Sequence, residues 1–216
     1  MRTPSGSLEP TISNWSVVPA GDFLARLPAA AAAKTRIIAV DGRSGAGKST
    51  LAEKLHLLIH SSFVLSTDDV AWNFSMFDWA DVLAEHVIDP VRDGRSVSYQ
   101  PPGWLAHGRT GSITIPAGRH TLIIEGVGAG QRALRHLLDA VIWVQSDRDA
   151  ARTQGIARDV ALGQHGGRTE SEAFWDEWMT AELPFLEDQQ TWARADFIVG
   201  GTGSSSVTED RIAVAD

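Results

Sequence analysis

The chain alternates short runs of consecutive apolar residues with longer segments in which apolar residues recur every three or four positions. Five runs are predicted to be strands: Arg36–Asp41, Phe63–Ser66, Thr121–Glu125, Ala140–Gln145 and Asp196–Val199. The intervening patterns predict helices at Leu51–Ile59, Trp79–Val91 with an interruption near Pro90, Gln131–Leu138, from about Arg148, and Glu170–Trp192. Because the strands are almost uniformly apolar, both sheet faces should be covered. The alternation predicts a three-layer α/β fold with a five-stranded parallel sheet and helices on both faces.

The remaining segments are predicted to flank or interrupt one main domain spanning residues 21–200. Residues 1–20 mix prolines with Ser, Thr and Gly, so we expect an extended lead-in outside the main core. A short helix is expected within residues 21–33, broken at Pro28. Residues 201–216 are predicted to be a partly ordered tail. Residues 92–119 are rich in Gly, Pro and polar groups, and are predicted to form an inserted loop or short hairpin beside the functional site.

Composition limits the classes of partner. The chain has 216 residues, 43% of them hydrophobic, which is enough for one substantial core. Its formal charge of −8, without a basic run, disfavours a nucleic-acid partner. No apolar run approaches the length of a membrane span, so no membrane association is expected. The absence of cysteine excludes disulfides and thiolate chemistry and fits a cytoplasmic protein.

The segment from Gly42 to Thr50 matches the phosphate-binding loop Gly-x-x-x-x-Gly-Lys-Ser/Thr and lies between a predicted strand and a predicted helix. Glycines let backbone N–H groups converge on phosphate oxygens, and the helix N-terminus adds positive potential. Lys48 is expected to reach the β and γ phosphates, and Ser49 to ligate Mg²⁺. Thr50 fits a role in the loop or as a helix cap. The residues expected to bind ATP are Gly42, Ser44, Gly45, Ala46, Gly47, Lys48, Ser49 and Thr50.

A phosphate-binding loop alone does not distinguish a kinase from a GTP switch or an ATPase. The switch is disfavoured because Asn14 and Asn73 are the only asparagines and neither begins an Asn-Lys-x-Asp segment. Asp68 and Asp69 follow the second predicted strand, at the sheet edge where ligands bind. One could accept a proton from an acceptor hydroxyl while the other holds a substrate hydroxyl or a magnesium-bound water. Alternatively, the pair caps a following turn.

Glu125 brings a third carboxylate to the same predicted edge, since it ends the Leu122-Ile-Ile run and precedes Gly126. We expect it to assist magnesium binding. The alternative is a solvated strand end, where carboxylates are common without being ligands.

Taken in order, several motifs resemble the uridine kinase-like branch of the P-loop kinases, which also includes phosphoribulokinase and pantothenate kinase. The resemblance covers roughly residues 36–200. Its motifs are Asp41 to Thr50, Ser66-Thr-Asp-Asp69, Phe77-Asp-Trp79, Asp93-Gly-Arg95 through Tyr99, Leu122-Ile-Ile-Glu-Gly126, and Arg158-Asp159. Only the first is specific by itself; the order and spacing of the others add weight. The resemblance implies a P-loop NTPase fold that uses ATP and Mg²⁺.

The resemblance also implies roles for particular residues. Asp68 would be the catalytic base, Glu125 would assist magnesium, and the acceptor pocket would be lined by Phe77, Asp78 and Tyr99, with Asp69 as a further substrate contact. The resemblance implies a lid, at residues 148–169, which departs from the family pattern of clustered arginines: the arginines found for that pattern are Arg152, Arg158 and Arg168. Arg158 is expected to reach the transferred phosphate, with solvated helix faces as the alternative for all three. Gln100-Pro-Pro-Gly follows Tyr99 where an aspartate is common, so nucleoside specificity does not follow.

Aromatic residues divide into two groups. Trp175, Trp178 and Phe185, together with Glu182, recur at helical spacing and predict one packed helix face. By contrast, Trp72, Phe74 and Phe77 follow the aspartate pair and either stack on a planar acceptor or pack a flap.

These observations predict an ATP-dependent phosphotransferase acting on a hydroxyl of a small metabolite that is nucleoside-like, a sugar or a pantothenate-like alcohol. A regulatory ATPase module without a small-molecule acceptor is the alternative. The acceptor and the oligomeric state stay open, a homodimer being one assembly that the sequence allows.

Overall fold

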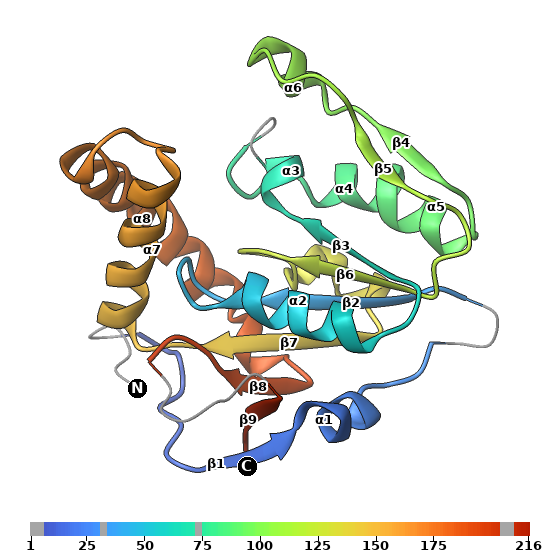
Figure 1. Ribbon diagram of the computed structural model, residues 1–216, viewed down its shortest axis with the longest axis horizontal. Coiled ribbons are helices and arrows are strands. Elements are labelled where there is room, and N and C mark those ends of the chain that lie inside the picture. Colours follow the sequence, from blue (N-terminus) through green and yellow to red (C-terminus); the bar gives the residue numbers. More distant parts are fainter. Residues whose placement is uncertain (1–6, 31–33, 72–74, 204–209) are drawn as a thin grey trace.

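The computed structural model describes residues 7–30, 34–71, 75–203 and 210–216. Its centre is a seven-stranded sheet in the order β1-β9-β8-β7-β2-β6-β3 (Figure 1). The strands are β1 (Trp15–Pro19), β2 (Arg36–Asp41), β3 (Ser62–Ser66), β6 (Thr121–Glu125), β7 (Ala140–Gln145), β8 (Phe197–Gly200) and β9 (Arg211–Ala215). The five predicted strands are all present and run parallel to one another. The predicted α/β class is therefore confirmed.

The sheet register brings the carboxyl ends of three parallel strands to the same level. Glu125, the last residue of β6, pairs with Val40 in β2 and with Ser66 in β3. The segments that follow these strands therefore leave the sheet side by side, at the edge where open α/β sheets bind ligands.

Helices cover both faces because successive side chains of β2 point in opposite directions. Ile37 and Ala39 belong to one core cluster, whereas Ile38 and Val40 belong to another. The first cluster includes side chains of α4 (Ala80–Leu83), the π-helical turn η1 (Ala84–Ile88) and α5 (Asp89–Arg92). The second includes side chains of α1 (Ala20–Arg26) and α2 (Lys48–Leu58). This gives the three predicted layers.

Both flanking segments contribute to the fold, which corrects the expectation that residues 1–20 lie outside the main core. β1 and β9 pair antiparallel and extend the sheet beyond β8, and Ile212 of β9 is buried. Ahead of β1, the side chain of Glu9 is buried and forms an ion pair with Arg43. The described part of residues 1–20 therefore contributes to the core, and residues 201–216 include β9, which lies between β1 and β8 in the sheet. The domain boundaries themselves stay a prediction.

The predicted interruption near Pro90 is wrong. α4, η1 and α5 follow one another directly, with Pro90 in the first turn of α5. In an α-helix a proline ring clashes with the carbonyl four residues earlier and lacks an N–H donor. The wider π-helical turn immediately before Pro90 accommodates both effects.

The predicted hairpin at 92–119 is present as β4 (Val97–Tyr99) and β5 (Ile113–Ile115), with α6 (Pro102–Ala106) between them. It projects beyond the sheet on the side of α3 (Asp68–Ala71) (Figure 1). The predicted helix at 131–138 is a 3₁₀ helix, η2 (Arg132–Leu137).

Two long helices stand beside each other past the end of β7: α7 (Arg148–Leu162) and α8 (Arg168–Gln189) (Figure 1). A short 3₁₀ helix, η3 (Thr191–Ala193), then leads to β8. Within the described ranges, no helix is both long and apolar enough to cross a membrane.

Candidate active site

The loop between β2 and α2 is tightly curled. Gly42, Gly45 and Gly47 have φ angles of 151°, 72° and 96°. A Cβ on Gly45 would lie 2.2 Å from the Ala151 carbonyl oxygen, closer than real Cβ contacts allow. Glycine is therefore required there by backbone conformation and by the close approach of α7. The loop ends at Lys48, the first residue of α2, so it leads into a helix N-terminus as predicted.

The predicted lysine, serine and glutamate come together beneath this loop. Lys48 is buried and its Nζ donates a hydrogen bond to the Arg43 carbonyl oxygen at 2.9 Å. The Ser49 hydroxyl donates to Glu125 Oε2 at 3.2 Å. Thr50 lies exposed in the first turn of α2. The sheet register and the loop thus join two residues that are 76 positions apart in sequence.

Glu125 has an unusual electrostatic environment. Burial raises the pKa of its carboxyl, Lys48 opposes that rise, and Asp68 adds to it. Asp68 is therefore close enough to Glu125 for the two charges to interact. The two carboxylates differ in their surroundings, because Glu125 is buried whereas Asp68 is exposed at the start of α3.

Asp69 is part of the contact between α3 and the hairpin. Its Oδ1 accepts a hydrogen bond from the Arg109 guanidinium at 2.5 Å, and its carbonyl oxygen accepts one from the Trp104 indole at 2.9 Å. Arg109 also lies over the Trp104 ring, 3.5 Å from its centroid. Asp68 and Asp69 are therefore differently engaged, although they are adjacent in sequence.

Asp41 is a site residue to which the sequence analysis gave no role of its own. It is fully buried and accepts N–H bonds from Gly42 at 2.7 Å, Gly128 at 2.9 Å and Gly130 at 3.0 Å. Burial raises its pKa, and these three donors and Lys48 oppose the rise. Asp41 thereby joins the phosphate-binding loop to the loop that follows β6. The signal in the sequence was an acid at the end of an otherwise apolar strand.

The residues predicted to contact the acceptor pack against different helices. Phe77 stacks on Phe185 of α8, with ring centroids 4.0 Å apart. Tyr99 stacks on His86 of η1 at 4.2 Å, and burial raises the Tyr99 pKa. Asp78 is exposed. Phe77 and Tyr99 thus pack against different elements, and Trp72 and Phe74 lie outside the described residues.

The arginines of the predicted lid have separate partners. Arg158 is exposed and bonds to Asp159 at 2.7 Å, and Arg168 contacts Glu172 at 3.0 Å. Arg152 pairs with Asp176 at 2.8 Å, across the gap between α7 and α8.

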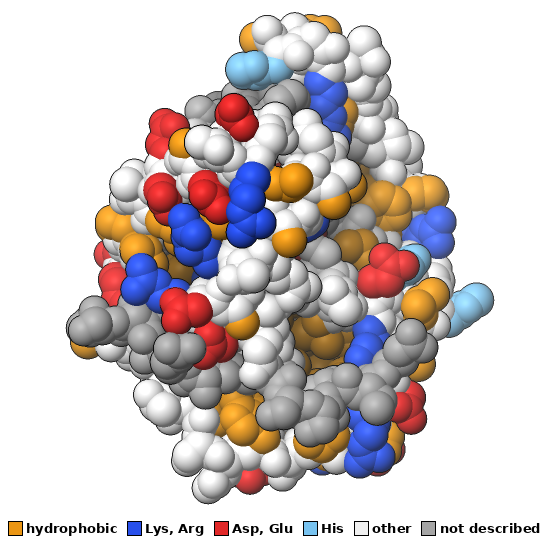
Figure 2. Space-filling view, turned by 60° about the vertical axis from the view of Figure 1, so that its left-hand side comes forward, with side chains coloured by type: hydrophobic (Ala, Val, Ile, Leu, Met, Phe, Trp, Pro, Cys, Tyr) orange, Lys and Arg blue, Asp and Glu red, His pale blue; other side chains and the backbone are white. Residues whose placement is uncertain are grey.

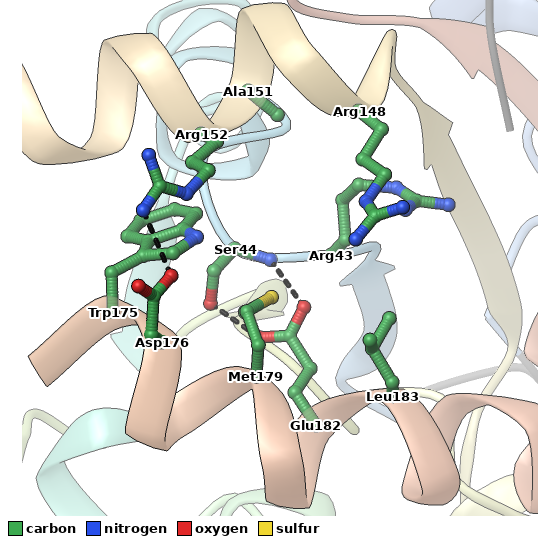
Figure 3. Close-up of a pocket in the computed structure, with 10 residues that line it drawn as sticks. All are labelled: Arg43, Ser44, Arg148, Ala151, Arg152, Trp175, Asp176, Met179, Glu182 and Leu183. Atoms are coloured by element: carbon green, nitrogen blue, oxygen red, sulfur yellow. Dashed lines mark hydrogen bonds and ion pairs between the residues drawn. The ribbon is translucent and has the colours of Figure 1, made fainter. Parts of the chain in front are cut away.

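A cavity of about 120 Å³ lies between α7, α8 and the phosphate-binding loop (Figure 3). Three arginines line it: Arg43, Arg148 and Arg152. Arg158 is not among the residues that line this cavity. The sequence analysis gave Arg148 no role; the available signal was its place as the first residue of α7, the helix that follows β7.

The packed face predicted for α8 is present, and it meets the phosphate-binding loop. Trp175 is buried against Gly155 and Gly45, where added Cβ atoms would lie 2.1 Å and 3.2 Å from the indole. Glu182 is buried as well, and its carboxylate accepts hydrogen bonds from Ser44 (Figure 3).

Comparison with known proteins identifies the fold. No family model and no curated protein matches the chain. A possible uridine kinase from Bacillus stearothermophilus superposes with a TM-score of 0.51 at 17% identity, over 82% of this chain and 93% of the other. A candidate fructose transport system kinase from Silicibacter sp. TM1040 gives 0.51 at 16%, over 71% and 84%. The YGR205w protein gives 0.54 at 11%, over 85% and 91%. The phosphate-binding loop, the sheet order and these likenesses together show that the chain has a uridine kinase-like P-loop kinase fold.

Proposed function

We propose that this protein is an ATP-dependent phosphotransferase that moves the γ-phosphoryl group of ATP to a hydroxyl of a small metabolite. The observation that carries the proposal is the single sheet edge shared by the loop with Lys48, the Ser49–Glu125 hydrogen bond and Asp68. A nucleotide-binding loop and a carboxylate that can act as a base are the two parts that phosphoryl transfer to an alcohol requires.

The loop fits the triphosphate of ATP. Gly42 and Gly45 have conformations and neighbours that exclude a Cβ, so the backbone itself forms the inner surface of the curl. Backbone N–H groups of such a curl and the N-terminus of α2 attract phosphate oxygens. Lys48, whose Nζ is bonded to the Arg43 carbonyl oxygen of the same loop, would supply the positive charge for the β and γ phosphates.

Ser49 and Glu125 fit Mg²⁺ as a partner of the nucleotide. The described residues contain no group of three acidic or histidine side chains that could hold a metal by themselves. Mg²⁺ commonly binds through one or two protein oxygens, with waters and substrate phosphates completing its shell. When bound, ATP would supply the phosphoryl group and Mg²⁺ would neutralise part of its charge. Ser49 offers a hydroxyl ligand, and Glu125 orients it and balances the ion.

Asp68 is the better candidate for the base of this reaction. Its carboxylate is exposed and close to Glu125, whereas Asp69 is engaged with Arg109. An exposed carboxylate can accept a proton from the attacking hydroxyl without first losing an ion pair. Asp69 would then hold the hairpin in place or contact the substrate.

The acceptor would lie on the side of the hairpin formed by β4 and β5, near Asp68. Tyr99, Phe77 and Asp78 remain candidates for contacting it, with Tyr99 supported by its position on β4. The exposed face that contains α7 and α8 intermingles acidic and basic side chains (Figure 2). Together with the net charge of −8, this favours a small metabolite over a nucleic acid.

The alternative is a regulatory module that binds and hydrolyses ATP without a small-molecule acceptor. The phosphate-binding loop is compatible with both, because hydrolysis uses the same loop. The hairpin next to the two aspartates favours the kinase, since a module without an acceptor does not need it.

The test combines an acceptor panel with two isosteric variants. Wild-type protein, Asp68→Asn and Asp69→Asn are assayed for ADP release with nucleosides, sugars and vitamin alcohols, and for MgATP affinity by calorimetry. We expect Asp68→Asn to lower acceptor-dependent turnover by about 10²- to 10⁴-fold with nearly unchanged affinity. A selective loss in Asp69→Asn would transfer the role of base to Asp69. Full activity in both variants would refute the assignment of either aspartate as the base, and ADP release that no acceptor stimulates would refute the proposed function.

A further inference from the structure

A fully buried carboxylate contacts the phosphate-binding loop from α8. Glu182 has no exposed surface, although an isolated buried carboxylate is costly in free energy. Its Oε1 accepts the Ser44 N–H at 2.9 Å, and its Oε2 accepts the Ser44 hydroxyl at 2.5 Å (Figure 3). The Trp178 indole N–H donates to the same Oε2 at 2.5 Å and to Ser44 Oγ at 3.0 Å. Two of the three donors to Glu182 therefore belong to a loop whose N–H groups ordinarily face phosphate.

The surroundings keep this carboxylate in place. Trp178 lies against Phe77, with ring centroids 5.5 Å apart, and Phe77 in turn stacks on Phe185. Glu182 cannot leave without depriving the N–H and the hydroxyl of Ser44 of their acceptor, and an unsatisfied buried donor is destabilising. Arg43 interacts electrostatically with Glu182 and offsets part of its charge. The network therefore has one principal acceptor, which is Glu182.

We infer that Glu182 is a positioning residue for the phosphate-binding loop. By binding the N–H and hydroxyl of Ser44, it holds the first half of the loop in a fixed curl. The N–H groups that follow Ser44 are then oriented toward the phosphates before the nucleotide arrives. Such pre-organisation favours binding because less conformational entropy is lost when the ligand binds. The inference rests on the proposed function for the identity of the ligand, which is MgATP. The effect on the loop itself can be measured without any nucleotide or reaction.

Electrostatic repulsion between the Glu182 carboxylate and the triphosphate would weaken nucleotide binding, whereas positioning of the loop strengthens it. Two observations favour positioning over repulsion. The carboxylate accepts three hydrogen bonds, which disperse its charge, and the positive charge of Arg43 acts on it electrostatically. Replacing Glu182 should therefore weaken nucleotide binding.

The chain offers a matched control on the same helix. Glu187 also accepts hydrogen bonds from a serine hydroxyl and a backbone N–H, those of Ser7 at 2.6 Å and Leu8 at 3.2 Å. Glu187→Gln removes the same charge from α8 and perturbs an equivalent pair of bonds, but not those of the phosphate-binding loop. Any general effect of losing a carboxylate from α8 should appear in both variants.

The experiment compares wild type, Glu182→Gln, Glu182→Ala and Glu187→Gln in the full chain. Hydrogen exchange of peptides covering residues 42–49 is measured without nucleotide, and the MgATP dissociation constant is measured by calorimetry. We expect faster loop exchange and an increase in the dissociation constant of about tenfold or more in Glu182→Ala, because hydrogen bonds to a charged group are strong. Glu182→Gln should give a smaller change in the same direction, since its amide oxygen can still accept the Ser44 N–H. Glu187→Gln should match wild type.

Equal loop exchange in Glu182→Ala and wild type, or tighter MgATP binding in either Glu182 variant, would overturn the inference. So would an equal effect of Glu187→Gln, which would identify a general consequence of changing α8. If Glu182→Ala does not fold, Glu182→Gln decides by the same two measurements. A wild-type protein that binds MgATP but transfers no phosphoryl group would count against the proposed function alone.

Discussion

Replacing Gly155 by alanine should destabilise the protein, although the same change ordinarily stabilises a helix. Gly155 lies within α7 and faces the indole of Trp175 on α8. A Cβ at Gly155 would lie 2.1 Å and 2.3 Å from two carbons of that ring. Carbon atoms in contact are normally about 3.5–4.0 Å apart. Because Trp175 is buried, the overlap is relieved only if the two helices move apart or the indole is displaced.

The magnitude follows from two opposing effects. Alanine in place of glycine within a helix contributes about 1 kcal/mol of stability. Overpacking a core contact typically costs about 1–3 kcal/mol, and an overlap of more than 1 Å belongs at the upper end. The net loss should be about 2 kcal/mol in the free energy of unfolding. For a chain of this length that is a decrease of about 4–8 °C in Tm.

Gly21→Ala is the matched control, because Gly21 lies in α1 and a Cβ there would meet nothing within 4 Å. We expect it to be as stable as wild type or more so, about 3 kcal/mol above Gly155→Ala. Urea unfolding of both variants, followed by circular dichroism, measures the difference. In a Trp175→Phe background the smaller ring leaves room, so the cost of Gly155→Ala should decrease. If Gly155→Ala is as stable as wild type, or costs the same in that background, the close contact between α7 and α8 is not what requires glycine.

Three further predictions concern the candidate site. Lys48→Ala should abolish phosphoryl transfer, because the lysine charge would stabilise the transferred phosphoryl group. Its Tm should stay within a few degrees of wild type, because the Lys48 amine is bonded to a loop carbonyl oxygen. Wild-type turnover in this variant would show that Lys48 has no role in transfer. Arg152→Ala should lower turnover more than Arg158→Ala, since Arg152 lines the cavity beside the loop whereas Arg158 is exposed and bonded to Asp159. A lower kcat in Arg158→Ala than in Arg152→Ala would instead favour Arg158 as the lid residue that acts on the phosphate. The raised pKa of Glu125 means that its carboxyl takes up a proton at higher pH than an exposed glutamate does. This protonation stabilises the metal-free fold at low pH, and the stabilisation is lost as pH rises through the raised pKa. Mg²⁺-dependent ATP affinity should therefore fall as pH drops through that raised pKa, and calorimetry of Glu125→Gln should find weaker binding without this dependence.

The parts of the fold that the sequence predicted are those coded by local patterns. The five parallel strands are continuous apolar runs because they are buried on both faces, and that signal needs no knowledge of their neighbours. β1 and β9 were missed because β1 is an edge strand and the two strands pair with each other across almost the whole chain. Ser16 and Pro19 also interrupt the apolar pattern of β1, and proline is tolerated at such edges.

The helical face on α8 shows where local patterns stop being informative. The spacing of Trp175, Trp178, Glu182 and Phe185 correctly predicts one buried face. It does not reveal that the face meets the phosphate-binding loop, because Ser44 is 138 positions from Glu182. An acid within an aromatic stripe was the one local signal that this face has a polar partner.

In the candidate site too, local sequence patterns place some residues and tertiary contacts place others, and the sheet register explains the difference. Glu125 is paired with Val40 on one side and Ser66 on the other, so the three chain segments that follow β2, β3 and β6 emerge at one level. A shift of one residue in either pairing would turn the Glu125 side chain to the opposite face of the sheet, away from Ser49. Residues that directly follow strands are therefore placed by the same apolar patterns that predict the strands. Arg148, Arg152 and Glu182 come instead from helices packed onto that edge, and their positions depend on tertiary contacts such as the one between Gly155 and Trp175. This is why sequence reasoning located the nucleotide side of the site more completely than the lid.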